Sequence, residues 1–123
     1  MSKPFGFTGR IRSIQHALCG VWTMLYSQHN AWIHAFATFA VVGAGFWFCI
    51  SNTECCIITL AIMAVWTAEA LNTAFEFLAD ATTKEYHPLI KKSKDIAAGA
   101  VLISAFGAAI IGVIIFGPRI LNL

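Results

Sequence analysis

The sequence predicts an all-α integral membrane protein, with three transmembrane helices after an amphipathic surface helix, in one domain that covers residues 1–123. Composition is the first reason, because 59% of the 123 residues are hydrophobic and only 11% are charged. So small a chain could not bury that much apolar surface in water. The second reason is that residues 13–53 and 96–116 contain no Asp, Glu, Lys or Arg, and about 20 apolar residues suffice to cross a hydrocarbon core of roughly 30 Å. These runs lack period-2 alternation, so we interpret them as helices.

The first element is a surface helix at about residues 8–27. Its apolar residues recur at helical spacing, and basic or polar residues occupy the rest of the wheel. This pattern is typical of a helix in the membrane interface. A helix packed on the bundle is an equally good interpretation, and both can hold. The apolar residues are Ile11, Ile14, Leu18, Val21, Trp22 and Leu25.

Three apolar segments follow, at about residues 31–50, 55–80 and 95–117. The first contains His34, which we interpret as a hydrogen-bonded packing residue rather than a metal ligand, since unpaired polar groups are costly in lipid. In the third segment Ala100, Ser104 and Ala108 recur every four residues. Such a seam of small residues permits close helix packing, within one chain or between chains.

Basic residues predict the orientation. Seven of the eight Lys and Arg residues lie before the first span or between the second and the third. An excess of basic residues marks the cytoplasmic side of a membrane, so we expect the N-terminus in the cytoplasm and the C-terminus outside. The seven are Lys3, Arg10, Arg12, Lys84, Lys91, Lys92 and Lys94.

A polar stripe ends the second span. In "EALNTAFEFLAD" the side chains of Glu69, Asn72, Glu76 and Asp80 share one helix face. Acids within a span mark ion paths, proton relays or catalytic sites. Asp80 could simply reach water, as could Glu85, or pair with loop lysines. Glu69 lies nearly three turns further in, where a role as general base is a better explanation.

The loop "KEYHPLIKKSKD" adds complementary groups. We interpret Lys84, Lys91 and Lys92 as contacts to anionic lipid headgroups. Lys94 and Asp95 open the third span, where a cation could reach a phosphate and an acid could hold a metal ion or a ribose. Carboxylates, an amide and a lysine at one boundary are the groups that phosphoryl transfer needs. The chain has neither a P-loop nor a G-x-G-x-x-G motif, so any kinase here has another fold.

Three segments carry a resemblance to a known family: "EALNTAFEFLAD", "EYHPLIKKSKDIAAGAVL" and, more loosely, "HNAWIHAF". From about Ser13 to Gly112 the chain resembles the prokaryotic diacylglycerol kinases, small three-span membrane enzymes that form homotrimers and phosphorylate a lipid alcohol with MgATP. It looks closer to the branch that acts on undecaprenol. The resemblance implies ATP and Mg²⁺ as cofactors, a lipid substrate (undecaprenol or diacylglycerol), a bacterial cytoplasmic (inner) membrane location and no nucleic-acid partner.

The resemblance also implies roles for individual residues. Glu69 matches the general base for the lipid hydroxyl, and Asn72 is the amide beside it. Glu76 matches a glutamate that binds the metal and contacts the nucleotide phosphates, and Lys94 with Asp95 matches the nucleotide-binding pair. Further nucleotide contacts are expected from Arg12, His16, Asp80, Glu85, Tyr86 and His87.

Two positions depart from the family pattern. Gly9 occupies the place of an arginine early in the surface helix, and Arg10 follows it. Gln28 stands where the family typically has a second metal-binding glutamate, and its neutral carbonyl is a poorer Mg²⁺ ligand than a carboxylate. We expect the metal at Glu76 and Gln28, with His29 as an alternative neutral ligand.

Two other functions fit the same residues. A small proton-coupled transporter also uses an intramembrane glutamate, although it would need neither ATP nor the pair Lys94 and Asp95. A non-catalytic family member that binds lipid or nucleotide is the second alternative, because Gln28 weakens the expected metal site.

Overall fold

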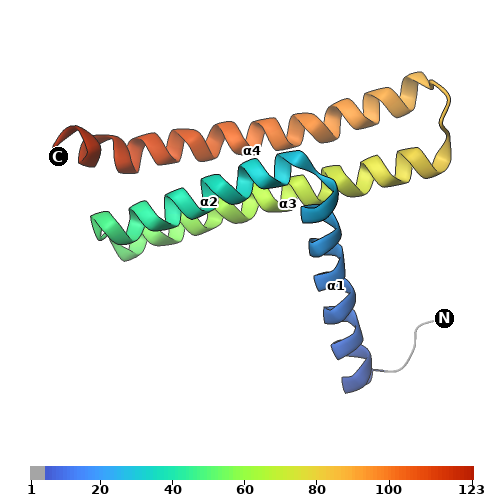
Figure 1. The fold of residues 1–123 in the computed structure, drawn as a ribbon, viewed down its shortest axis with the longest axis horizontal. Coiled ribbons are helices and arrows are strands. Elements are labelled where there is room, and N and C mark those ends of the chain that lie inside the picture. Colours follow the sequence, from blue (N-terminus) through green and yellow to red (C-terminus); the bar gives the residue numbers. More distant parts are fainter. Residues whose placement is uncertain (1–4) are drawn as a thin grey trace.

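A computed structural model of the chain describes residues 5–123, so Lys3 lies outside the described residues. Its elements are α1 (Phe7–Ser27), α2 (His29–Phe48), α3 (Asn52–Thr82) and α4 (Pro88–Leu121) (Figure 1). No strand occurs between residues 5 and 123. The last three helices are long and apolar enough to cross a membrane. The predicted all-helical, three-span fold is therefore confirmed.

α3 and α4 form a long antiparallel hairpin, and α2 lies beside the first part of α3 (Figure 1). The register of α2 against α3 follows from two contacts: Trp66 Nε1 donates a hydrogen bond of 2.9 Å to Thr38 Oγ1, and His34 lies opposite Glu69. The start of α2 therefore lies near Thr73. Beyond that residue the hairpin continues without α2.

Helix length explains this difference. α2 has 20 residues, about 30 Å at 1.5 Å per residue, which matches the hydrocarbon core. The 31 residues of α3 and the 34 of α4 give about 46 Å and 51 Å. Both exceed the expected segments 55–80 and 95–117. Their extra turns lie at the end joined by residues 83–87 (Figure 1), so at this end both helices are longer than a hydrocarbon core requires.

The opposite end of the bundle holds the apolar core. Ile58, Ile115 and Phe116 are buried together there, and Phe48 packs against them. The turn between α2 and α3 is tight for two reasons. Cys49 adopts a left-handed conformation (φ 51°), and Gly45 leaves room for the side chain of Ile50. A Cβ at Gly45 would lie 3.3 Å from Ile50 Cδ1.

α3 begins with a capping box. Ser51 Oγ accepts a hydrogen bond from the Glu54 backbone N–H (3.2 Å), and Glu54 Oε1 accepts one from the Ser51 N–H (3.0 Å). Two of the N–H groups that a helix start leaves without partners are satisfied in this way. Glu54 also binds Arg119 near the end of α4 with two hydrogen bonds of 2.8 Å and 2.9 Å. These contacts join the start of α3 to the end of α4.

α1 projects away from the other helices (Figure 1). Met24 is buried at its junction with the bundle, whereas the apolar residues earlier in the helix, such as Ile14 and Leu18, stay exposed. This arrangement fits a helix in the membrane interface better than one packed along the bundle. The chain reverses direction at Gln28, whose backbone is extended between α1 and α2.

Candidate active site

The polar stripe of α3 runs from the interior of the bundle to its surface. Glu69 is fully buried and Asn72 is 8% exposed, whereas the side chain of Glu76 is 36% exposed and that of Asp80 70%. The gradient arises because α2 and α4 cover the inner part of the stripe and only α4 lies along the outer part. One helix face therefore presents a buried carboxylate and two accessible ones.

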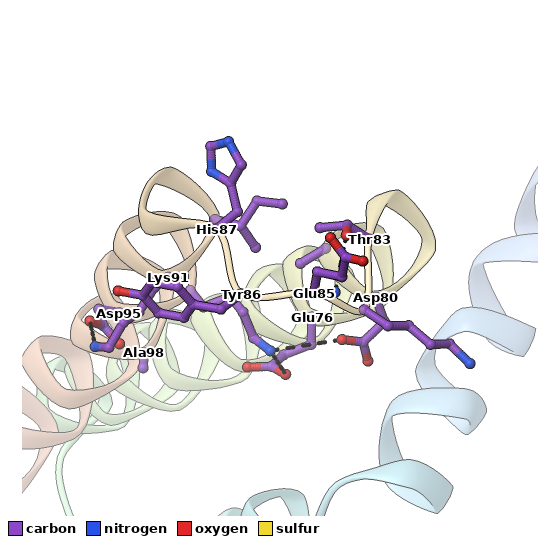
Figure 2. A pocket seen from close by; sticks show the side chains of 13 residues that line it. Glu76, Asp80, Thr83, Glu85, Tyr86, His87, Lys91, Asp95 and Ala98 are labelled. Atoms are coloured by element: carbon purple, nitrogen blue, oxygen red, sulfur yellow. Dashed lines mark hydrogen bonds and ion pairs between the residues drawn. The ribbon is translucent and has the colours of Figure 1, made fainter.

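The outer part of the stripe opens into a cleft of about 940 Å³ where α3, the connecting loop and α4 meet (Figure 2). Every nucleotide-binding residue that the sequence predicts on these three segments lines it. They are Glu76, Asp80, Glu85, Tyr86, His87, Lys94 and Asp95. The cleft thus gathers carboxylates from both helices together with Lys84, Lys91 and Lys94.

Lys94 lies between two carboxylates of the facing helix. Its Nζ is 3.4 Å from Glu76 Oε2 and 3.8 Å from Asp80 Oδ1. The three groups together carry a net charge of −1, which favours a cation nearby. Lys94 is one-third exposed, so its ammonium is accessible to an anionic ligand in the cleft.

Lys91 forms a second ion pair in the cleft, at 2.6 Å from Asp95 Oδ2. Sequence reasoning missed this role, because it assigned Lys91 to lipid headgroups. The spacing of four residues on one helix, typical of such pairs, is the signal that could have found it. Both side chains are well exposed, and a pair of this kind is worth only about 0–1 kcal/mol, so a ligand can replace it at small cost.

The connecting loop is held by short-range hydrogen bonds. Thr83 Oγ1 accepts from the Glu85 N–H at 3.1 Å, and His87 Nδ1 accepts from the Leu89 N–H at 3.2 Å. His87 therefore caps α4, and Pro88 occupies the first helical position, where no N–H is needed. In Figure 2 the His87 ring points away from the other labelled side chains. Tyr86 remains 77% exposed.

Glu69 does not line this cleft. Its Oε2 lies 3.3 Å from His34 Nε2. Neither Glu69 oxygen has a hydrogen-bond partner among the described residues, and Asn72 Oδ1 also lacks one. Buried polar atoms are costly unless they are paired, so this group of atoms is suited to receive a polar ligand.

Asn72 connects two hollows. One is a largely apolar groove of about 850 Å³ between α3 and α4, and the other is a cavity of about 250 Å³ that His34 also lines. The groove runs past Leu71 and Phe75 to Lys92 at the polar end of α4. An amphiphile with a long apolar tail could lie there with its polar end at Asn72.

Three predicted site residues lie elsewhere in the single chain. Arg12 and His16 are exposed on α1, and Gln28 is at the break before α2; none of them lines the cleft, the groove or the small cavity. Their roles remain predictions, as does the contribution of Gln28 to a metal site.

Glu76 and Asp80 fit a magnesium ion that a nucleotide shares. Within residues 5–123, no three His, Cys, Asp or Glu side chains are close enough to hold a metal by themselves. Mg²⁺ usually takes one or two carboxylates, with phosphate oxygens and waters completing its octahedron. Two oxygen donors one helical turn apart, next to the ammonium of Lys94, meet that requirement.

Comparison with known proteins agrees with this chemistry. The profile of a family described as "Prokaryotic diacylglycerol kinase" matches residues 15–116. The chain is 41% identical over 109 residues to the protein named "Undecaprenol kinase" from Bacillus subtilis (strain 168), covering 89% of each chain. It is 37% identical over 112 residues to "Diacylglycerol kinase" from Synechocystis sp. (strain ATCC 27184 / PCC 6803 / Kazusa), covering 90% of this chain and 64% of that protein.

Proposed function

The chain belongs to the prokaryotic diacylglycerol kinase family and is a lipid kinase, and we propose that it transfers the γ-phosphoryl group of MgATP to a membrane lipid alcohol. Undecaprenol is the proposed substrate, ahead of diacylglycerol. Its support is the 41% identity to an undecaprenol kinase over nearly the whole chain, and the margin over diacylglycerol is narrow. A transporter has no support from these relatives.

One observation carries the proposal: a single face of α3 joins a charged cleft to a polar site beside an apolar groove. Glu76 lies in the cleft, and Asn72, one turn away, lines the groove. Because residues four apart on a helix are neighbours, a donor in the cleft and an acceptor in the groove would meet along this face. A lipid kinase needs such a meeting, because its donor comes from water and its acceptor from the membrane.

In the cleft, the chain's own residues bind and orient the nucleotide. We assign Lys94 to the transferred phosphate, because its ammonium lies beside Glu76, the proposed metal ligand, and is one-third exposed. Asp95, Tyr86 and Glu85 would contact the rest of the nucleotide. Glu76, aided by Asp80, would hold Mg²⁺, which when bound offsets charge on the phosphate oxygens.

At the inner end of the stripe, Glu69 would act as general base. The lipid hydroxyl oxygen forms a bond to the γ-phosphorus while the bond from that phosphorus to its bridging oxygen breaks, and ADP leaves. The hydroxyl proton passes to a Glu69 carboxylate oxygen. Asn72, whose Oδ1 has no partner among the described residues, would orient the hydroxyl.

A competition assay tests the substrate. Purified protein in lipid bicelles receives ATP with undecaprenol and a diacylglycerol at matched surface concentrations, and mass spectrometry detects both phosphorylated products. We expect the polyprenol to be phosphorylated faster. The reverse preference would overturn the lipid assignment and leave the kinase intact, whereas no product from either lipid would favour the non-catalytic alternative.

We also propose, from the family resemblance, that the enzyme is a homotrimer in the bacterial inner membrane. Its cleft would face the cytoplasm, where ATP is available. The basic residues support this orientation, because the cleft lies at the end of the hairpin that carries Lys84, Lys91, Lys92 and Lys94.

A further inference from the structure

We propose that His34 is a positioning residue for Glu69: its imidazole holds the buried carboxylate in one orientation. The inference rests on the proposed role of Glu69 as base. His34 Nε2 lies 3.3 Å from Glu69 Oε2, and the two side chains are 14% and 0% exposed. A fully buried carboxylate is costly to keep charged without a partner, and His34 is the group that can supply one.

Two other donors near Glu69, the Thr73 hydroxyl and the Trp66 indole, already have partners. Thr73 Oγ1 donates to the Glu69 backbone carbonyl at 2.9 Å and not to its carboxylate. Trp66 Nε1 donates to Thr38 Oγ1. Among the described residues, no hydrogen bond reaches either Glu69 carboxylate oxygen or His34 Nε2. The 3.3 Å separation is already within hydrogen-bond distance, so a small reorientation of either side chain would give both a partner.

The surroundings of His34 fix its ring. Trp66 lies edge-on to the imidazole, with ring centroids 6.2 Å apart and an interplanar angle of 68°. Thr38 Oγ1, one turn along α2, donates to the His34 carbonyl at 2.7 Å while it accepts from Trp66. The imidazole is thus held by packing on one side and faces Glu69 with Nε2.

The charge around the pair depends on few groups. Both small cavities that His34 lines, about 240 Å³ and 250 Å³, contain no other titratable side chain. Their walls come from α2, α3 and α4 and are apolar, apart from hydroxyl and amide groups. The titratable residues of α1 are exposed. Among the residues that line these two cavities, His34 is therefore the one titratable partner for the Glu69 carboxylate.

His34 and Asn72 line the same small cavity. With the imidazole on Oε2, Oε1 is left to receive the hydroxyl proton. In the proposed arrangement Asn72 contacts the lipid hydroxyl, and His34 acts through Glu69. It keeps the carboxylate aimed until the proton arrives.

The test compares two substitutions of His34 in the full-length protein in bicelles, with ATP and the lipid that the competition assay identifies. His34→Leu removes the donor and keeps an apolar side chain of similar reach; we expect kcat to fall by about 10²-fold or more, with KM for ATP within about twofold. His34→Gln keeps an N–H donor and should retain kcat within about tenfold.

Thr59→Val is the matched control. It removes a hydroxyl on α3 that donates to the Cys55 carbonyl and contacts neither His34 nor Glu69, so kcat should stay within about twofold. Equal loss of kcat in His34→Gln and His34→Leu would make His34 a packing residue and overturn the proposal. Unchanged kinetics in His34→Leu would overturn it too.

A double variant separates this inference from the assignment of the base. If His34 acts through Glu69, adding His34→Leu to Glu69→Gln should cause no further loss. A further loss of tenfold or more would overturn the inference. If Glu69→Gln alone retains activity, the assignment of the base fails, whatever His34→Leu does.

Discussion

Glu69 is the residue on which the chemistry depends most. Glu69→Gln keeps the shape of the buried side chain and removes its ability to accept a proton. We expect kcat to fall on the order of 10²–10⁴-fold, the usual cost of losing a general base. Thermal unfolding and size-exclusion profiles should match the parent protein, since a neutral amide is less costly to bury than a carboxylate. Activity within a few-fold of the parent would remove Glu69 from this role.

Substitutions at Gln28 and Glu76 should change the Mg²⁺ dependence of activity in opposite directions. Removal of a charged ligand weakens a site for a hard cation, so a protein with glutamine at position 28 should need high free Mg²⁺. Gln28→Glu should then lower the half-saturating Mg²⁺ concentration in a titration at saturating ATP and lipid. Glu76→Gln should lose activity at every Mg²⁺ concentration, because Glu76 is the proposed link between metal and phosphate.

The outcome of Gln28→Glu distinguishes two explanations for glutamine at this position. An unmoved Mg²⁺ curve in an active Gln28→Glu protein would place position 28 away from the metal. That outcome would agree with the single chain, in which Gln28 does not line the cleft. An inactive parent that Gln28→Glu activates would identify the chain as a disabled kinase.

Among the elements, the hairpin of α3 and α4 depends on a clamp far from the cleft. Arg119 donates two hydrogen bonds to the Glu54 carboxylate and a third, of 2.7 Å, to the Ile115 carbonyl. We expect Arg119→Gln and Glu54→Gln each to lower Tm by several degrees, with kcat within about twofold. The double variant should lose little more than either single variant, because both break the same contact. Full additivity in thermal unfolding would show that the two side chains stabilise the fold separately.

The elements also show what sequence alone can predict. The apolar runs predicted three spans, and the spacing of Glu69 and Asp80 placed both on one face of a helix, because these features depend only on local periodicity. The contact between Glu54 and Arg119 joins residues 65 apart. It depends on how α3 and α4 dock, and no local pattern encodes that.

His34 shows the same limit within the site. Alone in an apolar run, it was interpreted as a packing residue, because no sequence signal places it opposite Glu69. The register of α2 against α3 brings the pair to 3.3 Å. The helix ends were equally hard to predict: charged residues at the start of α4 suggested a span from about residue 95, whereas the helix begins at Pro88. Polar residues continue a helix into water as readily as apolar ones continue it into lipid.

For the whole molecule, the basic residues at the cleft predict that this end of the bundle faces the cytoplasm and that the turn between α2 and α3 faces the outside. The four cysteines are free and exposed in the chain, and Cys49 lies at the turn between α2 and α3, the end opposite the cleft. If the basic loop faces the cytoplasm, a membrane-impermeant thiol reagent should label Cys49 in intact cells. A second protein that lacks the native cysteines and carries Lys84→Cys should be labelled only after permeabilisation, because residue 84 lies at the cleft. The control is the cysteine-free chain, which should stay unlabelled in both conditions. The opposite pattern would place the cleft outside, away from cytoplasmic ATP, and would leave the proposed donor without access to Lys94.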